Sequence, residues 1–307
     1  MAKALYKQTK SGSLFSRFFR YIWRNRAAYL MIAPLMIGVL VFSYYPPLYG
    51  FWLSFTDKTT VTAGNLVGFD NFKQLFEDPI FLESFGTMLK IQIPRLISSV
   101  VVPLVYAEIV FGLSNKKAQG IYRIFILLPT VAPGVVTTLL WKQIYTVDGL
   151  MNSLFGLGEI DWLGDPDFVI AAILIQGFPW IGGSQVLIYL AGIMNIPRDY
   201  FEAADLDGAG VWRKIFTIHI PLISGQIRYF LIFGIINGLQ DYGTQVVLTQ
   251  GGPGYATNVP GYYMYEMMSY FGNYGKAAAI GVVLFLIIMV LTIITNKFVK
   301  FGDTADD

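Results

Sequence analysis

The stretch from Ala277 to Thr295 reads AAAIGVVLFLIIMVLTIIT, nineteen residues without a single charge. A helix needs about 20 apolar residues to cross the hydrocarbon core of a bilayer, so this run predicts a membrane span over 277–299. Earlier in the chain, comparable apolar runs predict five further spans, at 28–54, 86–112, 121–145, 168–194 and 228–249. The sequence is therefore expected to form an all-α, polytopic membrane protein with about six transmembrane helices.

The composition supports a membrane protein and excludes several other classes. Of the 307 residues, 55% are hydrophobic and 14% are charged, whereas soluble domains carry roughly 25% charged residues. A net charge of +2 gives no indication of nucleic-acid binding. The chain has no cysteine and one histidine, His219, so it offers neither a disulfide nor a thiolate metal site, and it lacks the ligands of a zinc site. We interpret His219 as structural or interfacial.

The distribution of Lys and Arg predicts the orientation of the chain. Sixteen of the 22 such residues lie before the first run, within 113–124 and 195–228, or after residue 296. Six spans place all four of these segments on one side of the membrane. Short loops rich in Lys and Arg face the cytoplasm, so both termini are expected to be cytoplasmic.

The N-terminal segment has an amphipathic pattern of its own. Its apolar side chains recur at helical spacing: Phe15, Phe18, Phe19, Ile22 and Trp23. Its opposite face carries three cations: Arg17, Arg20 and Arg24. Residues 1–27 are therefore expected to form a basic helix in the inner headgroup layer. The permease domain proper would then cover 28–300, with a short cytoplasmic tail at 301–307.

The fifth run carries one polar stripe at helical spacing: Asn237, Gln240, Asp241, Thr244 and Gln245. Exposing Asp241 to lipid would cost about 2.5–3.5 kcal/mol, so this face should be turned toward protein or water. The fourth run adds polar and aromatic residues at spacings of four: Gln176, Trp180 and Ser184. Such residues either line a substrate path or hold helices together, and both interpretations stay open. Arg95 is expected to pair with a carboxylate.

The predicted cytoplasmic loop at 195–224 has an unusual sequence, which begins IPRDYFEAADLDGAG at Ile196. Pro197 and Asp199 are typical of a helix start, and Gly208 is typical of a helix end. A second short helix is expected to run from Val211 to Pro221. The loop is therefore predicted to be two short helices joined by a glycine elbow at the inner face of the membrane.

This loop resembles the EAA loop of ABC-importer permeases. The residues that match in type and spacing are Glu202, Ala203, Ala204, Gly208, Ile218 and Pro221. The flanking segments resemble the maltose-type carbohydrate branch, at Tyr45-Pro46, Leu128-Pro129 and 248–254. The resemblance extends from Ala28 to Lys300, and the chain is identified as a binding-protein-dependent transport inner membrane component.

The resemblance implies a type I ABC-importer permease fold in a bacterial plasma (inner) membrane. It implies four kinds of partner: a second homologous permease, two copies of a cytoplasmic ATPase, an external substrate-binding protein and the lipid bilayer. The loop would dock on the ATPase, with Phe201 and Leu206 as apolar anchors, and the binding protein would meet the outer segments 146–167 and 251–274. The cargo would be a sugar or oligosaccharide.

The chain itself is not expected to be an enzyme or to bind a cofactor. Its Gly275-Lys276 pair has Tyr270 where a P-loop requires its first glycine, so ATP and magnesium would be used by the partner ATPase. Related importers of glycerol-phosphate, phosphate or polyamines remain alternatives for the cargo. An ion-coupled secondary carrier is less favoured, because the apolar runs do not predict the broken mid-membrane helices typical of that class.

Overall fold

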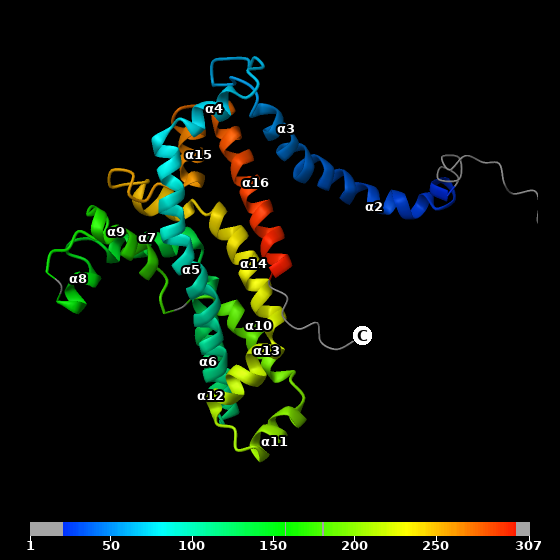
Figure 1. Ribbon diagram of the computed structural model, residues 1–307, viewed down its shortest axis with the longest axis vertical. Coiled ribbons are helices and arrows are strands. Elements are labelled where there is room, and N and C mark those ends of the chain that lie inside the picture. The colour runs from blue at the N-terminus through cyan, green and yellow to red at the C-terminus, as the bar shows by residue number, and fades with distance from the viewer. Residues whose placement is uncertain (1–20, 157, 180, 299–307) are drawn as a thin grey trace, which may run out of the picture. The chain divides into compact units, whose positions relative to one another are not determined.

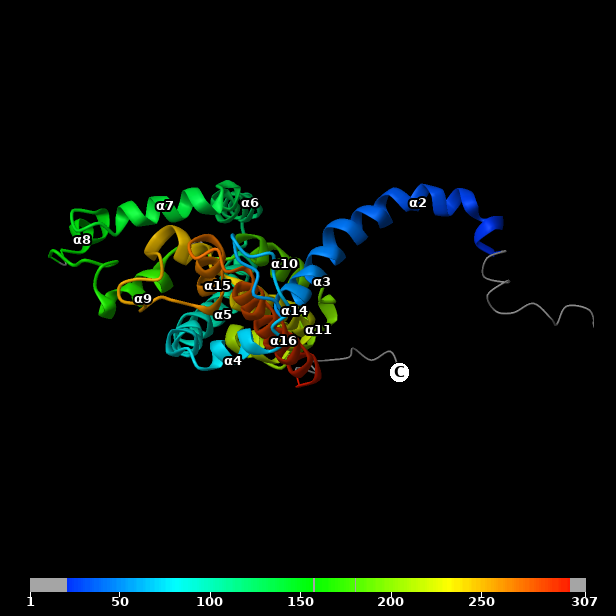
Figure 2. The same cartoon turned by 90° about the horizontal axis from the view of Figure 1, so that it is seen from above.

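The computed structural model describes residues 21–156, 158–179 and 181–298, and this part of the chain contains helices but no named strand (Figures 1 and 2). The longer helices are α2 (Arg26–Val39), α5 (Pro79–Gly112), α6 (Lys116–Leu127), α7 (Gly134–Ile144), α9 (Pro166–Ile175), α10 (Gly183–Met194), α14 (Ser224–Gln240), α15 (Pro260–Ser269) and α16 (Tyr274–Phe298). The shorter α-helices are α3 (Tyr45–Leu53), α4 (Asp70–Phe76), α8 (Leu150–Phe155), α11 (Arg198–Leu206), α12 (Val211–Lys214) and α13 (Ile220–Leu222). Three short π-helices, η1 (Leu40–Tyr44), η3 (Ile215–His219) and η4 (Gln245–Thr249), and one 3-10 helix, η2 (Leu128–Val131), are also present.

The chain divides into two units, residues up to Trp52 and residues from Leu53 onward. In the first unit α2, the π-helical turn η1 and α3 follow one another without a gap, and the apolar helix runs from Arg26 to Leu53. Residues 21–24 before it are helical as well. Phe15, Phe18 and Phe19, which carry most of the predicted amphipathic pattern, lie outside the described residues.

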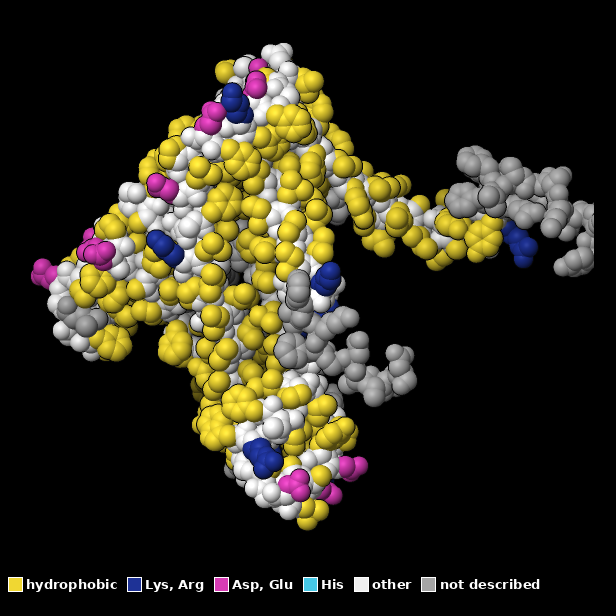
Figure 3. Space-filling view, in the orientation of Figure 1, with side chains coloured by type: hydrophobic (Ala, Val, Ile, Leu, Met, Phe, Trp, Pro, Cys, Tyr) yellow, Lys and Arg dark blue, Asp and Glu magenta, His cyan; other side chains and the backbone are white. Residues whose placement is uncertain are grey.

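In the second unit α5 is the central helix. It packs against α10 and α14, while α16 packs against α15 and α14. Figure 3 shows hydrophobic side chains over α5 and α16, with charged side chains gathered near α4 and α11. Apolar flanks with charge at the two ends are typical of a helical bundle that lies in a bilayer.

Among the described residues, length and composition identify three continuous helices that could cross a membrane: Arg26–Leu53, Pro79–Gly112 and Tyr274–Lys297. Two further spans are bent pairs, Lys116–Val131 with Gly134–Ile144 at 90° and Val211–Leu222 with Ser224–Thr249 at 69°. The predicted span 168–194 is divided into the two shorter apolar helices α9 and α10. The all-helical membrane architecture is thus confirmed, and three of the six predicted spans are bent or divided rather than continuous helices.

One end of α5 is fixed by Asp78, its N-cap residue. The Asp78 carboxylate accepts hydrogen bonds from the backbone N–H of Ile80 and Phe81 at 3.1 and 3.4 Å. It also accepts from the Tyr263 hydroxyl and from Lys276 Nζ, the latter at 3.1 Å. Burial opposes ionisation of this carboxyl, but its hydrogen bonds and the charge of Lys276 outweigh burial and hold the pKa of Asp78 below its ordinary value. The cap therefore joins α5 to α15 and α16.

Candidate functional site

The predicted coupling loop is present as two helical segments joined at a glycine. Helix α11 starts directly after Pro197 and ends at Leu206, and Gly208 follows with a φ of 68°. The N–H of Ala209 donates to the carbonyl of Ala204 at 2.8 Å, which is the bonding pattern of a helix that ends in a left-handed residue. The second segment runs through α12 and the π-helix η3 to Pro221 in α13. The expected helix–elbow–helix arrangement is confirmed.

The side chains of α11 divide into an outward and an inward set. Glu202 and Ala203 are exposed, and Leu206 is 91% exposed. Ala204 is buried at 8% exposure. Phe201 is half-buried, with its ring 5.9 Å from that of Phe111 on α5. The outward set can meet a partner, whereas Phe201 also packs against α5 within the chain, and its role as an anchor for the ATPase stays a prediction.

The other two residues of the EAA pattern lie in the second segment. Ile218 is half-buried and packs against the apolar cluster between α5 and α10. Pro221 is exposed. Pro221 cannot donate a backbone hydrogen bond, and in a regular α-helix its ring would clash with the carbonyl four residues earlier. The wider π-helical turn η3 ends two residues before Pro221, and its backbone geometry can accommodate such a residue.

Three of the predicted spans are interrupted, and the interruptions border cavities. Span three bends at Ala132 and Pro133, between η2 and α7. In span four, α9 ends at Ile175 and α10 begins only at Gly183. Gly182, directly before α10, has a φ of 71° that L side chains rarely adopt. Span five leaves its helix at Asp241. Irregular backbone at membrane depth is tolerated where it lines a cavity or is buried in protein.

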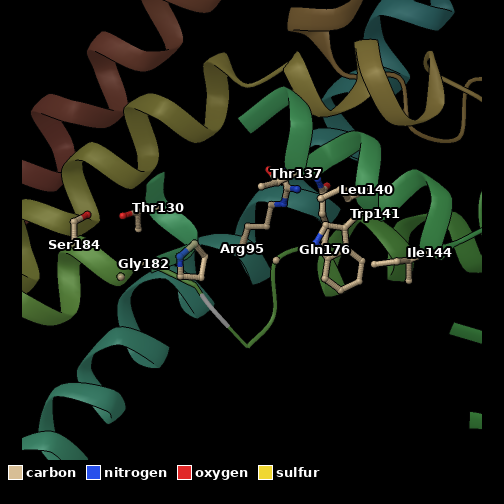
Figure 4. A pocket seen from close by; sticks show the side chains of 12 residues that line it. Arg95, Thr130, Thr137, Leu140, Trp141, Ile144, Gln176, Gly182 and Ser184 are labelled. Atoms are coloured by element: carbon tan, nitrogen blue, oxygen red, sulfur yellow. The ribbon is translucent and has the colours of Figure 1, made fainter. Parts of the chain in front are cut away.

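The largest of these cavities has a volume of about 550 Å³ and lies between spans three and four. Its polar and aromatic lining comprises Arg95, Thr130, Thr137, Trp141, Gln176 and Ser184. Figure 4 shows Arg95, Thr137, Trp141 and Gln176 together at one end, with Thr130 and Ser184 at the other. Gln176 Nε2 donates to Thr138 Oγ1 at 3.0 Å, whereas its buried Oε1 has no partner among the described residues.

Arg95 borders this cavity and a second one of about 430 Å³. Its Nη1 lies 2.9 Å from Asp241 Oδ2, and the two side chains are 24% and 32% exposed. Its Nη2 donates to the carbonyl of Ile173 at 3.3 Å. The expected pairing of Arg95 with a carboxylate is confirmed, and each charge compensates the other in an apolar environment.

The polar stripe of span five is split by the end of α14 at Gln240. Asn237 and Asp241 line the second cavity, whereas Gln240, Asp241 and Thr244 line a third of about 480 Å³. Asp241 therefore borders two cavities and Arg95 joins them to the first. Gln245 is fully buried and lines none of the three, so the prediction of one continuous helical stripe is wrong, because the helix on which it rests stops.

Some cavity residues were not predicted to line the substrate path. Thr137 and Trp141 lie one helical turn apart on α7, and Gln92 lies on α5 with a buried Nε2 that has no partner in the described structure. The i, i+4 spacing of Thr137 and Trp141 was a signal that could have found them. Trp180 lies outside the described residues. Within the described part of the chain no three His, Asp or Glu side chains form a group that could hold a metal ion.

Comparison with known proteins agrees with this architecture. A family model described as "binding-protein-dependent transport system inner membrane component" matches residues 100–301. The probable ABC transporter permease YesP of Bacillus subtilis is 30% identical over 282 residues, which cover 89% of this chain and 90% of YesP. The trehalose/maltose transport permease MalF of Thermococcus litoralis is 30% identical over 281 residues, covering 90% and 94%.

A similar fold is found in the crystal structure of a bacterial alginate ABC transporter in complex with an alginate pentasaccharide-bound periplasmic protein. It matches with a TM-score of 0.82 at 24% identity, over 93% of this chain and 99% of that one. At this identity the likeness shows the fold alone. The family match and the 30% identity along most of the sequence show that the chain belongs to the binding-protein-dependent transport system inner membrane components.

Proposed function

We propose that this chain is the permease subunit of an ATP-driven ABC importer and forms, with a second homologous permease, the path of a sugar or oligosaccharide. An external binding protein delivers the cargo, and two copies of a cytoplasmic ATPase use ATP and magnesium to drive its passage. The observation that carries the proposal is the set of three cavities at the helix breaks, whose largely apolar lining carries hydroxyl and amide groups and one compensated pair of charges.

The charge balance of the cavities favours a neutral cargo. Arg95 is the one cation and Asp241 the one carboxylate among the described residues that line them, and they bind each other at 2.9 Å. A phosphate-bearing cargo would require a free cation, and a polyamine would require free carboxylates. The lining instead offers hydroxyl and amide groups with the Trp141 ring, which suit sugar hydroxyls and the face of a pyranose.

Two carboxamides that line these cavities have hydrogen-bonding capacity that the described part of the chain does not use. Gln176 Oε1 is a buried acceptor and Gln92 Nε2 a buried donor, and neither has a partner in the described structure. A buried polar group without a partner is costly. A sugar hydroxyl can both donate and accept, so a passing saccharide could satisfy either group.

Gln176→Ala is expected to reduce uptake about fivefold, because a neutral hydrogen bond contributes about 1 kcal/mol. Proteoliposomes that hold the complete importer and its binding protein would be tested with radiolabelled trehalose, maltose and maltotriose, and with glycerol-3-phosphate and spermidine. Gln143→Ala, an exposed glutamine on α7 outside the three cavities, is the matched control and should transport normally. Uptake of the phosphate ester or the polyamine in place of all three saccharides would contradict a neutral sugar cargo.

The coupling loop is proposed as the docking element for the ATPase. Glu202, Ala203 and Leu206 form an exposed face on α11, with a carboxylate for a basic partner residue, a small residue for close approach, and an apolar anchor. This assignment combines the exposure of these side chains with the EAA spacing of the sequence.

Both termini are proposed to be cytoplasmic, which single cysteines in this naturally cysteine-free chain can test. Ser114 and Ser153 are exposed and lie in segments predicted on opposite sides. In intact cells, Ser153→Cys is expected to react with a membrane-impermeant maleimide, and Ser114→Cys only after permeabilisation. Labelling of Ser114→Cys in intact cells would reverse the proposed orientation.

Unbroken helices are one of the grounds on which the sequence disfavours a secondary carrier, and that ground is wrong, because three spans are interrupted. What separates the two classes is membership of the binding-protein-dependent family together with the EAA loop. Broken helices around a cavity serve either class of transporter, since both must expose polar groups at membrane depth.

A further inference from the structure

His219 is a buried polar side chain that the proposed transport path does not use. It is the last residue of the π-helix η3 and is 4% exposed. Its Nδ1–H faces the carboxylate of Glu108 on α5, at 3.0 and 2.9 Å from the two oxygens. Its Nε2 is buried without a partner in the described structure, so the hydrogen bonding of the ring is directed to Glu108 alone.

The same ring lies between aromatic side chains of two other elements. The His219 and Phe111 rings meet edge to face, with centroids 5.5 Å apart at 85°. The ring of Phe201, which directly precedes Glu202, is 5.4 Å away at 62°. His219 thus contacts α5 through Glu108 and Phe111 and contacts α11 through Phe201, so both halves of the coupling loop and the central helix meet at this one side chain.

Helix α5 leads from this contact to the cavities. It is 34 residues long, or about 50 Å at 1.5 Å per residue. Glu108 lies near its end, and Arg95 lies thirteen residues earlier, about 20 Å along the axis. Arg95 binds Asp241 where the cavities join. One continuous helix, which includes Pro94 and Pro103, therefore carries a charged contact to the coupling loop and another to the proposed path.

Burying a carboxylate and an imidazole together has a cost that apolar residues at the same positions would avoid. The side chains of His219 and Glu108 are only 6% and 11% exposed, yet the surrounding cluster is apolar. A directional hydrogen bond holds two elements in one relative position more strictly than apolar contacts, which allow sliding. The π-helical turn that ends at His219 is also a geometry found frequently at functional sites.

We infer that the Glu108–His219 pair is the joint through which movement of the coupling loop is transmitted to α5, and so to the Arg95–Asp241 contact. The two residues are positioning residues that touch neither cargo nor nucleotide. The inference rests on the proposed role of the loop as the ATPase docking element. A partner that displaces α11 would displace Phe201 and His219 with it, and the bond to Glu108 would move α5.

The test is a pair of apolar replacements that keeps the packing and removes the bond. Glu108→Leu/His219→Phe fills the site with side chains of similar size, which for a buried ion pair is often neutral or stabilising. In the reconstituted importer, this variant is expected to assemble with the ATPase and to melt within a few degrees of the unchanged protein. Uptake of the best-transported saccharide of the panel above should fall about tenfold, while ATP hydrolysed per saccharide moved rises by the same factor.

Three further variants make the outcome specific. His219→Asn can keep an N–H donor toward Glu108 and is expected to bring the number of ATP hydrolysed per saccharide part of the way back to normal, whereas His219→Phe alone is not. Glu83→Gln makes a conservative carboxylate-to-amide change at an exposed site on α5 and should couple normally. A normal number of ATP hydrolysed per saccharide in Glu108→Leu/His219→Phe would contradict the role of this pair in coupling. A loss of uptake that is fully explained by a smaller amount of assembled complex would contradict it as well.

Gly208→Val, measured in the same preparation, separates this inference from the proposed function. If Gly208→Val weakens ATPase docking while the Glu108 and His219 variants couple normally, the joint is wrong and the loop assignment stands. If Gly208→Val also docks and couples normally, the loop assignment itself is wrong.

Discussion

Asp241→Leu is expected to reduce saccharide uptake roughly 100-fold, because it leaves the Arg95 guanidinium without its counter-charge. Removing one partner of a buried ion pair costs about 3–5 kcal/mol. The side chains of Arg95 and Asp241 are 24% and 32% exposed, so the lower end, about 3 kcal/mol, applies, and each 1.4 kcal/mol is a factor of ten. Uptake by proteoliposomes that hold the complete importer measures the effect.

The double variant Arg95→Leu/Asp241→Leu decides what the pair does. It removes both charges, so assembly and thermal stability should return close to those of the unchanged protein. Uptake should stay low, because Asp241 borders two cavities and Arg95 borders two. Ile236→Ala, a neighbour on α14 that lines none of these cavities, should have a mild effect. Full recovery of uptake in the double variant would show that the pair only holds helices together.

Gly208→Val is expected to lower both uptake and co-purification of the ATPase about 30-fold. The residue has a φ of 68°, a backbone conformation that disfavours any side chain and above all a β-branched one. The cost is about 2 kcal/mol, and an added Cβ meets no atom within 4 Å. The effect would therefore come from backbone strain in the elbow rather than from a steric clash.

Gly210 provides the matched control for this prediction. It lies two residues further along the same elbow, has a φ of −69° and also has open space around it. Gly210→Val should therefore retain uptake, and Gly208→Asn should retain most of it, because Asn tolerates the left-handed region. Equal losses from valine at 208 and at 210 would show that bulk in the elbow, not its backbone conformation, disturbs docking. Cargo binding by the external binding protein should be unchanged in every variant.

Local sequence patterns determined the helical class and the coupling loop. Apolar runs such as 277–295 specify a lipid-facing helix, because each residue of a helix is bonded within its own segment and only length and hydropathy matter. The elbow at Gly208 was predictable for a similar reason. A glycine that follows a short helix takes the left-handed conformation at no steric cost, and that preference does not depend on distant residues.

The substrate region could be predicted only in part, because helical periodicity assumes a helix that continues. Asn237, Gln240 and Asp241 do face cavities, as their polarity predicted. Their stripe ends where α14 ends at Gln240, and Gln245 is buried away from them. The apolar run 168–194 likewise contains no feature that fixes the length of the opening between α9 and α10. Helix breaks at membrane depth exist only where neighbouring elements satisfy the freed backbone groups.

Tertiary structure alone decided which charges meet. Arg95 and Asp241 are 146 residues apart in the sequence, and Glu108 and His219 are 111 apart. Taken singly, Arg95 and Glu108 are charges inside an apolar run, where an unpaired charge is costly. Each is accommodated by a partner from a distant part of the chain, Asp241 at the end of α14 and His219 in η3. Local patterns carry no information about that partner, because the pairing depends on which faces of α5, α14 and η3 pack together.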